Sequence, residues 1–306
     1  MAERMAVVLP QVVSSGQNGF IRKRQIVDDI LIGHELIHYL KNKRTGKKGF
    51  TALKVDMEKA YDRVEWPFLL AVLEKLGFNQ VWVRWVQECI STASFSVMVN
   101  GSPSGFFRST RGLRQGDPLS PLLFVICTEG LSTLLRQAID RKRLEGVRVS
   151  PRTPRISHLL FADDSYLFLR GSLQDCHNVM AVLQDYEALS GQKVNLAKSA
   201  VCFSRNIDGA DQEAMGSCLG IGAIEVHDKY LGLPTLVARS KSDTFRFLEE
   251  KLLERIKGWK QRHLSWAAKE TLLKAVAGAL PVQGMSCFKL PLTLCRRMDK
   301  HMARFC

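Results

Sequence analysis

The chain has 306 residues, 46% of them hydrophobic, with a mean hydropathy of −0.06, which excludes a disordered protein and allows sizeable cores. Its formal net charge of +14 and isoelectric point near 9.6 favour an anionic polymer as partner, although a basic globular protein without such a partner has the same composition. There is no C-x-x-C pair, no signal-peptide core and no run of about 18 apolar residues that would span a membrane. We therefore expect an intracellular protein in a reducing compartment, with no membrane partner.

The first predicted helix covers 26–40, where apolar residues recur at helical spacing. It contains His34-Glu35-Leu36-Ile37-His38, which fits the H-E-x-x-H pattern of zinc metallopeptidases. The continuation found in metzincins is absent, because Lys41 stands in place of its Gly and Arg44 in place of its third His. A zinc metallopeptidase is therefore kept only as a remote alternative.

A buried strand is predicted over 50–55, directly after a basic loop. Leu53 and Val55 lie on one face of this strand, and Asp56 comes at its exit on the other face. A carboxylate at the end of a strand is available to bind a cation.

Helices and one hairpin are predicted between this strand and residue 138. Trp66-Pro67 opens a helix, and 82–89 continues in helical register with aromatic residues that we expect in the core rather than stacked on nucleotides. Asn100-Gly101 after an apolar run predicts a β-hairpin. Ser120-Pro121 is expected to cap a long apolar helix that ends near Ala138.

Two adjacent carboxylates, Asp163 and Asp164, lie between the apolar runs 156–160 and 166–169, which predicts strand, acidic turn, strand. Paired carboxylates raise each other's pKa and require water or a cation. Asp56 adds a third carboxylate, and oxygen ligands of this kind suit two Mg²⁺ ions about 3.5–4 Å apart, which is the arrangement used for nucleotidyl transfer. Taken alone, an ordinary Asp-Asp hairpin turn has the same sequence.

Five segments carry a family resemblance. They are Asp56-Met-Glu-Lys-Ala-Tyr61-Asp62, Arg111-Gly-Leu-Arg-Gln115-Gly-Asp-Pro-Leu-Ser-Pro121, Phe161-Ala-Asp-Asp164, Ser190-Gly-Gln-Lys-Val-Asn-Leu-Ala-Lys198 and Lys229-Tyr-Leu-Gly-Leu-Pro234. In this order and at this spacing they resemble successive motifs of a reverse transcriptase. More narrowly, they resemble the LINE-type (non-LTR) retrotransposon enzymes, and the residues of the motifs are most similar to those of plant elements.

The resemblance implies an α+β fold with the right-hand polymerase architecture. Residues 1–48 are then a partial fingers segment, and 49–235 are a palm whose antiparallel sheet packs on helices. The motif-B segment, about 101–140, lies within the palm, and 236–306 form a partial, helical thumb.

The resemblance also assigns roles at the reacting end of the site. Asp56, Asp163 and Asp164 are implied to be catalytic and to hold two Mg²⁺ ions, with Mn²⁺ as the alternative ion. Lys198 matches a lysine that protonates or steadies the leaving pyrophosphate, and its alternative is a surface salt bridge.

Four residues are implied to contact the incoming nucleotide. Tyr61 matches the aromatic that lies under the sugar and would clash with a 2′-hydroxyl, and its alternative is a core residue. Gln115 and Gly116 match the segment that packs against the new base pair, since Gly allows close backbone approach and Gln both donates and accepts. Arg24 matches a basic residue of the fingers.

Template and primer contacts are implied for further residues. Arg111 and Arg114 meet template phosphate or are simply solvated. Segment 230–232 resembles the hairpin that grips the primer end, and the thumb adds basic residues. The residues of these two groups are Tyr230, Leu231, Gly232, Lys251, Arg255, Lys257 and Lys260.

Two departures from the family pattern are apparent. The family usually carries Pro-Gly before Arg24, where this chain has Arg22-Lys23. The chain also opens after the point where the first fingers motifs are expected and stops within the thumb, so we expect a fragment or a decayed copy.

The function implied is RNA-directed DNA polymerisation, with an RNA template, a DNA primer or target, and dNTPs as partners. A catalytically inactive nucleic-acid-binding remnant is the alternative from another class. A group II intron maturase would need a maturase domain that we do not find. A ribonucleoprotein in nucleus and cytoplasm is the expected location.

Overall fold

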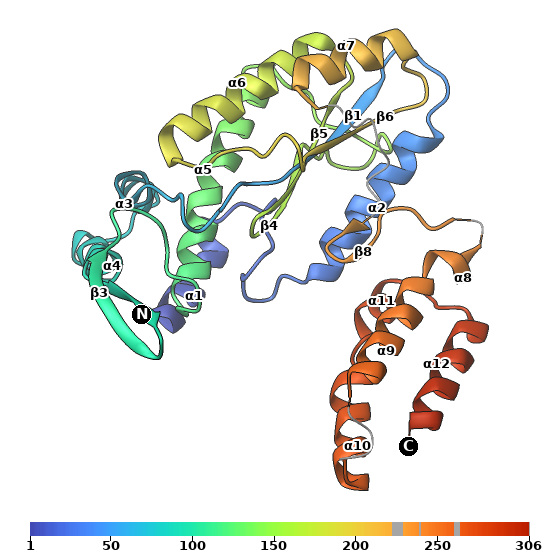
Figure 1. Cartoon of the computed structure of the whole chain (residues 1–306). Helices are drawn as coiled ribbons and strands as arrows, with labels where there is room; N and C mark the ends of the chain where they lie inside the picture. Colours follow the sequence, from blue (N-terminus) through green and yellow to red (C-terminus); the bar gives the residue numbers. More distant parts are fainter. Residues whose placement is uncertain (222–228, 239, 260–263, 306) are drawn as a thin grey trace. The chain divides into compact units, whose positions relative to one another are not determined.

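The computed structural model describes residues 1–221, 229–238, 240–259 and 264–305. The chain divides into two compact units (Figure 1). The first comprises Met1–Asp29 and Leu36–His227, and the second comprises Ile30–Glu35 and Asp228–Cys306. The expected boundaries between fingers, palm and thumb stay predictions, since compactness alone does not assign these names.

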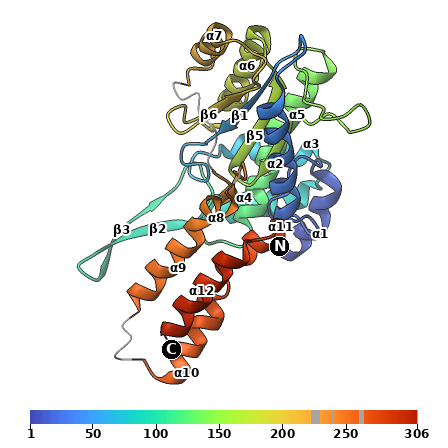
Figure 2. The same cartoon turned by 90° about the vertical axis from the view of Figure 1, so that its right-hand side faces the viewer.

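The centre of the first unit is a four-stranded antiparallel sheet with the order β4-β5-β1-β6 (Figure 2). The strands are β1 (Phe50–Val55), β4 (His158–Phe161), β5 (Asp164–Arg170) and β6 (Ala200–Phe203). The predicted strand at 50–55 and the strand, acidic turn, strand pattern are thereby confirmed.

Three helices cover one face of this sheet: α5 (Ser120–Asp140), α6 (Leu173–Ser190) and α7 (Gly209–Leu219) (Figure 1). Leu53, Val55 and Leu167 of the sheet share one core with Leu135 of α5 and Leu183 of α6. The alternation of side chains along β1 therefore sends the apolar set to the helices.

A second core lies beside the sheet, among α1 (Ala2–Val12), α3 (Trp66–Lys75), α4 (Gln80–Ser91) and the first half of α5. By length and composition α5 resembles a membrane-spanning helix, but 67% of its apolar window is buried inside the protein. Its first half packs in this core and its second half under the sheet, as expected of a central helix in a globular domain.

The predicted hairpin is present as β2 (Ser94–Val99) and β3 (Ser102–Arg108), and nearly all of its residues are exposed. The predicted first helix is α2 (Ile26–Asn42). One expectation is wrong: Ser120 does not cap α5, because it is already helical and Leu119 precedes the helix without a side-chain cap. Instead, the Leu119 N–H donates to the Asp117 carboxylate at 2.8 Å.

The second unit is mainly helical, as predicted for the C-terminal part. A small hairpin, β7 (Lys229–Tyr230) and β8 (Leu233–Pro234), precedes the short α8 (Lys241–Thr244). Then come α9 (Arg246–Gly258), α10 (Trp266–Leu272), a π-helical turn (Leu273–Ala277), α11 (Val282–Cys287) and α12 (Leu292–Phe305). The last two helices start directly after Pro281 and Pro291.

Candidate active site

The three predicted carboxylates come to the same end of the sheet. Val55, the last residue of β1, pairs with Ser165 of β5, so the next positions along this register are Asp56 and Asp164. Asp163 lies in the turn that joins Phe161 to Asp164. The backbone of Asp56 is fixed on both sides, because its N–H donates to Ser199 Oγ at 3.1 Å and its carbonyl accepts from Asn195 at 2.8 Å.

The surroundings of Asp164 change the pKa of its carboxyl group. Burial raises the pKa of Asp164, Lys54 lowers it, and the neighbouring charges of Asp163 and Asp56 raise it further. Asp164 is half-buried, whereas Asp163 is exposed. Hard oxygen donors at these positions fit a divalent cation. Within the described ranges, however, no three His, Cys, Asp or Glu side chains are close enough together to hold a metal, so the joint ligand set stays a prediction.

The turn between β4 and β5 is held in a conformation that its sequence does not favour. Ala162 has a φ of +53°, in the left-handed region that glycine normally occupies. Its N–H donates to the side-chain oxygen of Gln17 at 3.2 Å, and the same oxygen accepts from Gly19 at 2.8 Å. Gln17 is fully buried and also donates to Thr128 at 2.9 Å.

Gln17 belongs to a segment, 16–19, that runs along β4 beside the acidic turn. The N–H of Leu160 donates to the carbonyl of Gly16 at 2.7 Å, and the N–H of Asn18 donates to the carbonyl of Leu160 at 2.9 Å. We call this segment the brace. No sequence pattern predicts the brace, since the only local signal is Gln17-Asn18-Gly19, which is also ordinary loop sequence.

Arg24, predicted to contact the nucleotide, supports the brace in this structure. Its guanidinium donates to the backbone carbonyls of Val13, Ser14 and Gln17. The preceding residue Lys23 has a φ of +68° and stands where the family carries glycine. The loop keeps a left-handed residue there without glycine, and a nucleotide contact by Arg24 stays a prediction.

Asp29 is a second support of the brace. It is fully buried at the start of α2, and the side-chain amide of Asn18 donates to its carboxylate. The pKa of Asp29 is raised to about 7, mainly by burial and to a smaller extent by the charge of Asp28. The hydrogen bond from Asn18 and the charge of Arg24 act in the opposite direction and lower it. Near neutral pH this carboxyl group is therefore partly protonated.

Tyr61 is both a packed aromatic and a neighbour of the carboxylates. Its ring stacks on Phe124 with centroids 4.8 Å apart. Burial and the charge of Asp163 raise the pKa of its hydroxyl. A half-buried ring beside Asp163 agrees with the predicted place under the sugar and with the alternative of a core residue.

The predicted template-side loop is exposed beside a cleft of about 420 Å³. Gln115 and Gly116 are both exposed, and Gly116 has a φ of +87°. Arg111 lies 3.4 Å from Glu65, and Arg114 lies 4.0 Å from Asp117. Exposed pairs of this kind are weak, so both arginines remain available to a phosphate.

Lys198 lies on the loop that holds the end of β1. Asn195 and Ser199 of this loop bind the backbone of Asp56, and the Lys198 side chain is exposed between them in sequence. In the part of the chain that the structure describes, Lys198 makes no ion pair. The salt-bridge alternative therefore has no support here.

A family model described as reverse transcriptase (RNA-dependent DNA polymerase) matches residues 1–249. The chain belongs to this family. The predicted resemblance is confirmed, and so is the polymerase fold, which the solved telomerase of Candida albicans shares with a TM-score of 0.50. That structure is 13% identical, and the match covers 94% of this chain and 46% of the telomerase.

Curated relatives of this chain come from retrotransposons and from a plant. A transposon TX1 protein of Xenopus laevis is 30% identical over 64% of the chain and 14% of its own length. The Pol polyprotein of the retrotransposable element R2 of Popillia japonica is 29% identical over 57% of the chain and 28% of its own length. An uncharacterised mitochondrial protein of Arabidopsis thaliana is 60% identical over 22% of the chain and 56% of its own length. The relatives fit the predicted LINE-type class, and the chain spans about half or less of each.

The second unit contains the predicted primer hairpin. Leu231 and Gly232 form the turn between β7 and β8, with φ values of +48° and +81°. Tyr230 is buried, and Gln283 of α11 donates to the Leu231 carbonyl at 2.8 Å. Contact of this hairpin with a primer stays a prediction.

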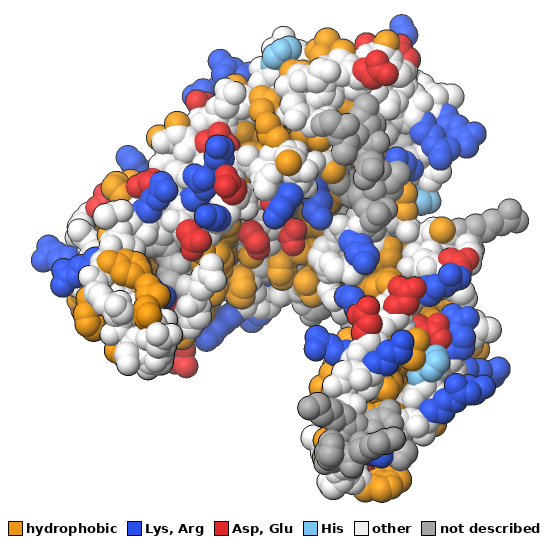
Figure 3. Space-filling view, viewed as in Figure 1, with side chains coloured by type: hydrophobic (Ala, Val, Ile, Leu, Met, Phe, Trp, Pro, Cys, Tyr) orange, Lys and Arg blue, Asp and Glu red, His pale blue; other side chains and the backbone are white. Residues whose placement is uncertain are grey.

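The predicted basic residues of the thumb lie on α9. Lys251, Arg255 and Lys257 are exposed, and Lys and Arg side chains gather over α9 and α12 (Figure 3). Lys251 Nζ lies 5.6 Å from the centre of the Phe247 ring. Lys260 lies outside the described residues.

The zinc-peptidase alternative finds no support in the residues that the structure describes. His34 packs edge-on against Phe288, with ring centroids 5.3 Å apart. A ring nitrogen of His38 pairs with the Asn42 amide at 2.9 Å. Since no metal-holding cluster occurs in the described ranges, both imidazoles are accounted for by packing and a local hydrogen bond.

Proposed function

We propose that the chain is the RNA-directed DNA polymerase domain of a non-LTR retrotransposon, which extends a DNA 3′ end along an RNA template. Membership of the reverse transcriptase family and the R2 and TX1 relatives support this class of reaction. The observation that carries the proposal is the convergence of Asp56 with the Asp163-Asp164 turn at one end of the sheet, where Asp164 is coupled to both neighbours.

The same three carboxylates are the proposed ligands of two Mg²⁺ ions, with Mn²⁺ as the alternative. Ions held there stabilise charge on the attacking and leaving oxygens of a phosphoryl displacement. Burial and the charges of Asp163 and Asp56 raise the pKa of Asp164, and a cation bound there would favour its ionised form.

The reaction forms a bond from the primer 3′-oxygen to the α-phosphorus of a dNTP and breaks the bond to pyrophosphate. Tyr61, beside Asp163, excludes a 2′-hydroxyl from the sugar position. Gln115 and Gly116 pack against the new base pair. Lys198, on the loop that fixes Asp56, donates a proton or a charge-assisted hydrogen bond to the leaving pyrophosphate.

The proposed macromolecular partners are an RNA template and a DNA primer or target. Arg111 and Arg114 at the cleft, and the exposed cations of α9, provide charges for phosphate contacts. The telomerase with the same fold was solved with a fragment of telomeric RNA.

A second candidate, a catalytically inactive nucleic-acid-binding remnant, is favoured by one observation. The donors of Arg24 are directed to backbone carbonyls of 13–17, so this guanidinium is not directed to a triphosphate. Without such a cation, charge developing on the phosphates is less well neutralised.

Single-turnover primer extension with Mg²⁺ separates the two candidates. We expect Asp163→Asn to lower extension by at least about 10²-fold and to leave RNA/DNA binding nearly unchanged. Asp185→Asn, an exposed carboxylate on α6, is the matched control and should retain activity. Near-normal extension by Asp163→Asn contradicts the proposed site, and binding without any extension by the unmodified chain supports the inactive remnant.

A further inference from the structure

A pocket with charged residues in its wall lies at the opposite end of the sheet from the carboxylates. Arg170 ends β5, six residues after Asp164 begins it, which places the pocket roughly 20 Å from the acidic turn at about 3.3 Å per residue. The pocket has a volume of about 540 Å³, and its walls come from the end of α5, the loop that follows, β5 and the start of α6. Its charged lining residues are Lys142, Arg143, Glu145, Arg155, Arg170 and Asp175.

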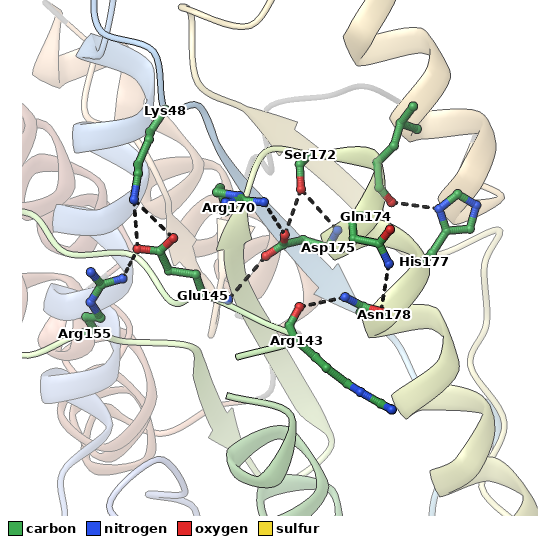
Figure 4. A network of polar contacts seen from close by, with 11 residues as sticks. Lys48, Arg143, Glu145, Arg155, Arg170, Ser172, Gln174, Asp175, His177 and Asn178 are labelled. Carbon is green, nitrogen blue, oxygen red and sulfur yellow. Dashed lines mark hydrogen bonds and ion pairs between the residues drawn. The ribbon is translucent and has the colours of Figure 1, made fainter. Parts of the chain in front are cut away.

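The two acidic groups of this pocket are paired with basic groups: Glu145 lies between Lys48 and Arg155, and Asp175 lies beside Arg170 (Figure 4). The Asp175 side chain is 5% exposed and accepts from Ser172 at 2.7 Å, with Arg170 at 3.4 Å. Glu145 is 26% exposed and lies between Arg155 and Lys48. The cations are 41–61% exposed, so the surface that reaches solvent is positive.

Lys142 and Arg143 of the pocket take no part in the ion pairs just described. Arg143 contributes its backbone carbonyl, which accepts from Asn178 at 2.7 Å, while its side chain and that of Lys142 are exposed. Within the described ranges neither side chain has an ion pair. These two groups are therefore available to an outside anion.

The positive surface continues beyond the pocket. In the adjoining loops 43–48 and 141–155 every charged residue except Glu145 is Lys or Arg. The two loops are joined, because Lys48 pairs with Glu145 at 3.4 Å. A continuous surface of this sign fits a chain of phosphates better than a single small anion.

We propose that this surface binds the phosphate backbone of a segment of RNA that lies outside the catalytic cleft. The inference rests on the proposed function, which requires an RNA much longer than the cleft. RNA fits better than DNA, because the pocket wall also carries Ser157, Gln174 and Asn178, whose hydroxyl and amide groups are of the kind that bind a 2′-hydroxyl. The pocket volume is in the range of about 300–1,000 Å³ that holds a nucleotide-sized group.

The test is the affinity of the full chain for a labelled RNA hairpin without primer, measured by anisotropy in EDTA across a salt series. EDTA and the absence of dNTPs and primer keep the result independent of whether the chain polymerises. We expect Lys142→Glu with Arg143→Glu to weaken RNA binding at least about tenfold and to lower the slope of log affinity against log salt by about 1–2. Lys75→Glu with Arg84→Glu makes the same charge change at exposed positions on α3 and α4, and it should change affinity less than about twofold.

Each outcome decides for or against this surface. An unchanged affinity, or an equal loss in the control pair, overturns the proposal. A DNA hairpin of the same sequence should bind less tightly than the RNA, and Lys142→Glu with Arg143→Glu should weaken its binding by a smaller factor. If the two substitutions weaken DNA binding by the same factor as RNA binding, the surface does not select RNA. If the variant with Lys142→Glu and Arg143→Glu fails to fold, Lys142→Ala with Arg143→Ala replaces it. This second variant should weaken RNA binding too, by a smaller factor, and an unchanged affinity would overturn the proposal.

Discussion

Two hairpins of the first unit form tight turns by opposite means. In β2–β3 the turn is Asn100-Gly101, with φ values of +50° and +84°, and the strands around it are exposed. In β4–β5 the turn is Ala162-Asp163, and Ala162 is left-handed only because buried groups hold it there. A turn chosen by its own residues can be read from the sequence, whereas a turn imposed by packing cannot.

The difference also concerns where backbone strain is kept. Outside Gly, Asn and Asp, a residue in the left-handed region costs roughly 1–2 kcal/mol, and such residues persist where the surrounding structure determines them. The strained turn here carries Asp163 and the unstrained one carries no carboxylate. We infer that the brace positions Asp163 and that β2–β3 has no comparable support.

The largest expected effect is the pH dependence of the brace through Asp29. The pKa of Asp29 is raised to about 7 in the folded protein, so between about pH 4 and 7 the folded chain holds a proton that the unfolded chain has released. Stability therefore falls as pH rises through this window, by up to about 4 kcal/mol at roughly 1.4 kcal/mol per unit of pKa. Asp29→Asn should abolish this decrease in stability with rising pH.

Urea unfolding of the unmodified chain and of Asp29→Asn, each at pH 4.5 and pH 8, measures this pH dependence of stability. Relative to the unmodified chain, Asp29→Asn should gain stability as pH rises. His158, whose burial lowers its pKa to about 4, has the opposite pH dependence but is common to both proteins and cancels in the difference. A difference that is independent of pH would contradict the raised pKa of Asp29.

The next effect is that of Gln17→Leu, which removes the side chain that holds the acidic turn. The N–H groups of Ala162 and Gly19 lose their acceptor, and we expect a loss of about 2–3 kcal/mol. If the chain is active, extension should also fall about tenfold or more, since a small displacement of the acidic turn misplaces Asp163.

Gln212→Leu is the control, because Gln212 donates one hydrogen bond to the Ile207 carbonyl far along the chain from the turn. Its activity per folded molecule should be unchanged. If Gln17→Leu loses stability but keeps full activity per folded molecule, the brace has no positioning role.

These residues show how far sequence reasoning reached. Strand β1, helix α3 and the Asn100-Gly101 hairpin follow from patterns of neighbouring residues, and each was predicted. The carboxylates were found because Asp56 and Asp163 directly follow or separate apolar strands. Gln17 was not found, since its partner Ala162 is 145 residues away and no local pattern marks the pair. Arg24 was noticed through family resemblance, but its three carbonyl partners depend on tertiary packing.

A smaller effect is expected from Gly101→Ala in the exposed hairpin. A side chain at a φ of +84° costs roughly 1–2 kcal/mol, but the cost should be confined to opening of β2–β3. Hydrogen exchange of the strand amides should become about tenfold faster while the melting temperature moves by less than about 2 °C. If the melting temperature of the first unit falls by more than about 2 °C, the hairpin unfolds together with the core.

The smallest effect is expected from Ala162→Gly. Relief of the left-handed strain offsets the lost methyl group and the added freedom of the unfolded chain, so stability should change by less than about 0.5 kcal/mol. Ala52→Gly in β1, also buried but with no positive φ, should cost about 1–2 kcal/mol. Equal losses in the two variants would show that Ala162 is not strained.

The brace has a consequence for how the chain acquires its structure. Residues 16–19 are made early, yet the β4 backbone that they bind is made only after some 145 residues have been added. Contacts so distant in sequence slow folding, because the loop between them must close first. Met5 and Leu9 of α1 likewise lack the α5 part of their core until residues 120–140 have been made, and this apolar surface is open to aggregation or to a chaperone during synthesis.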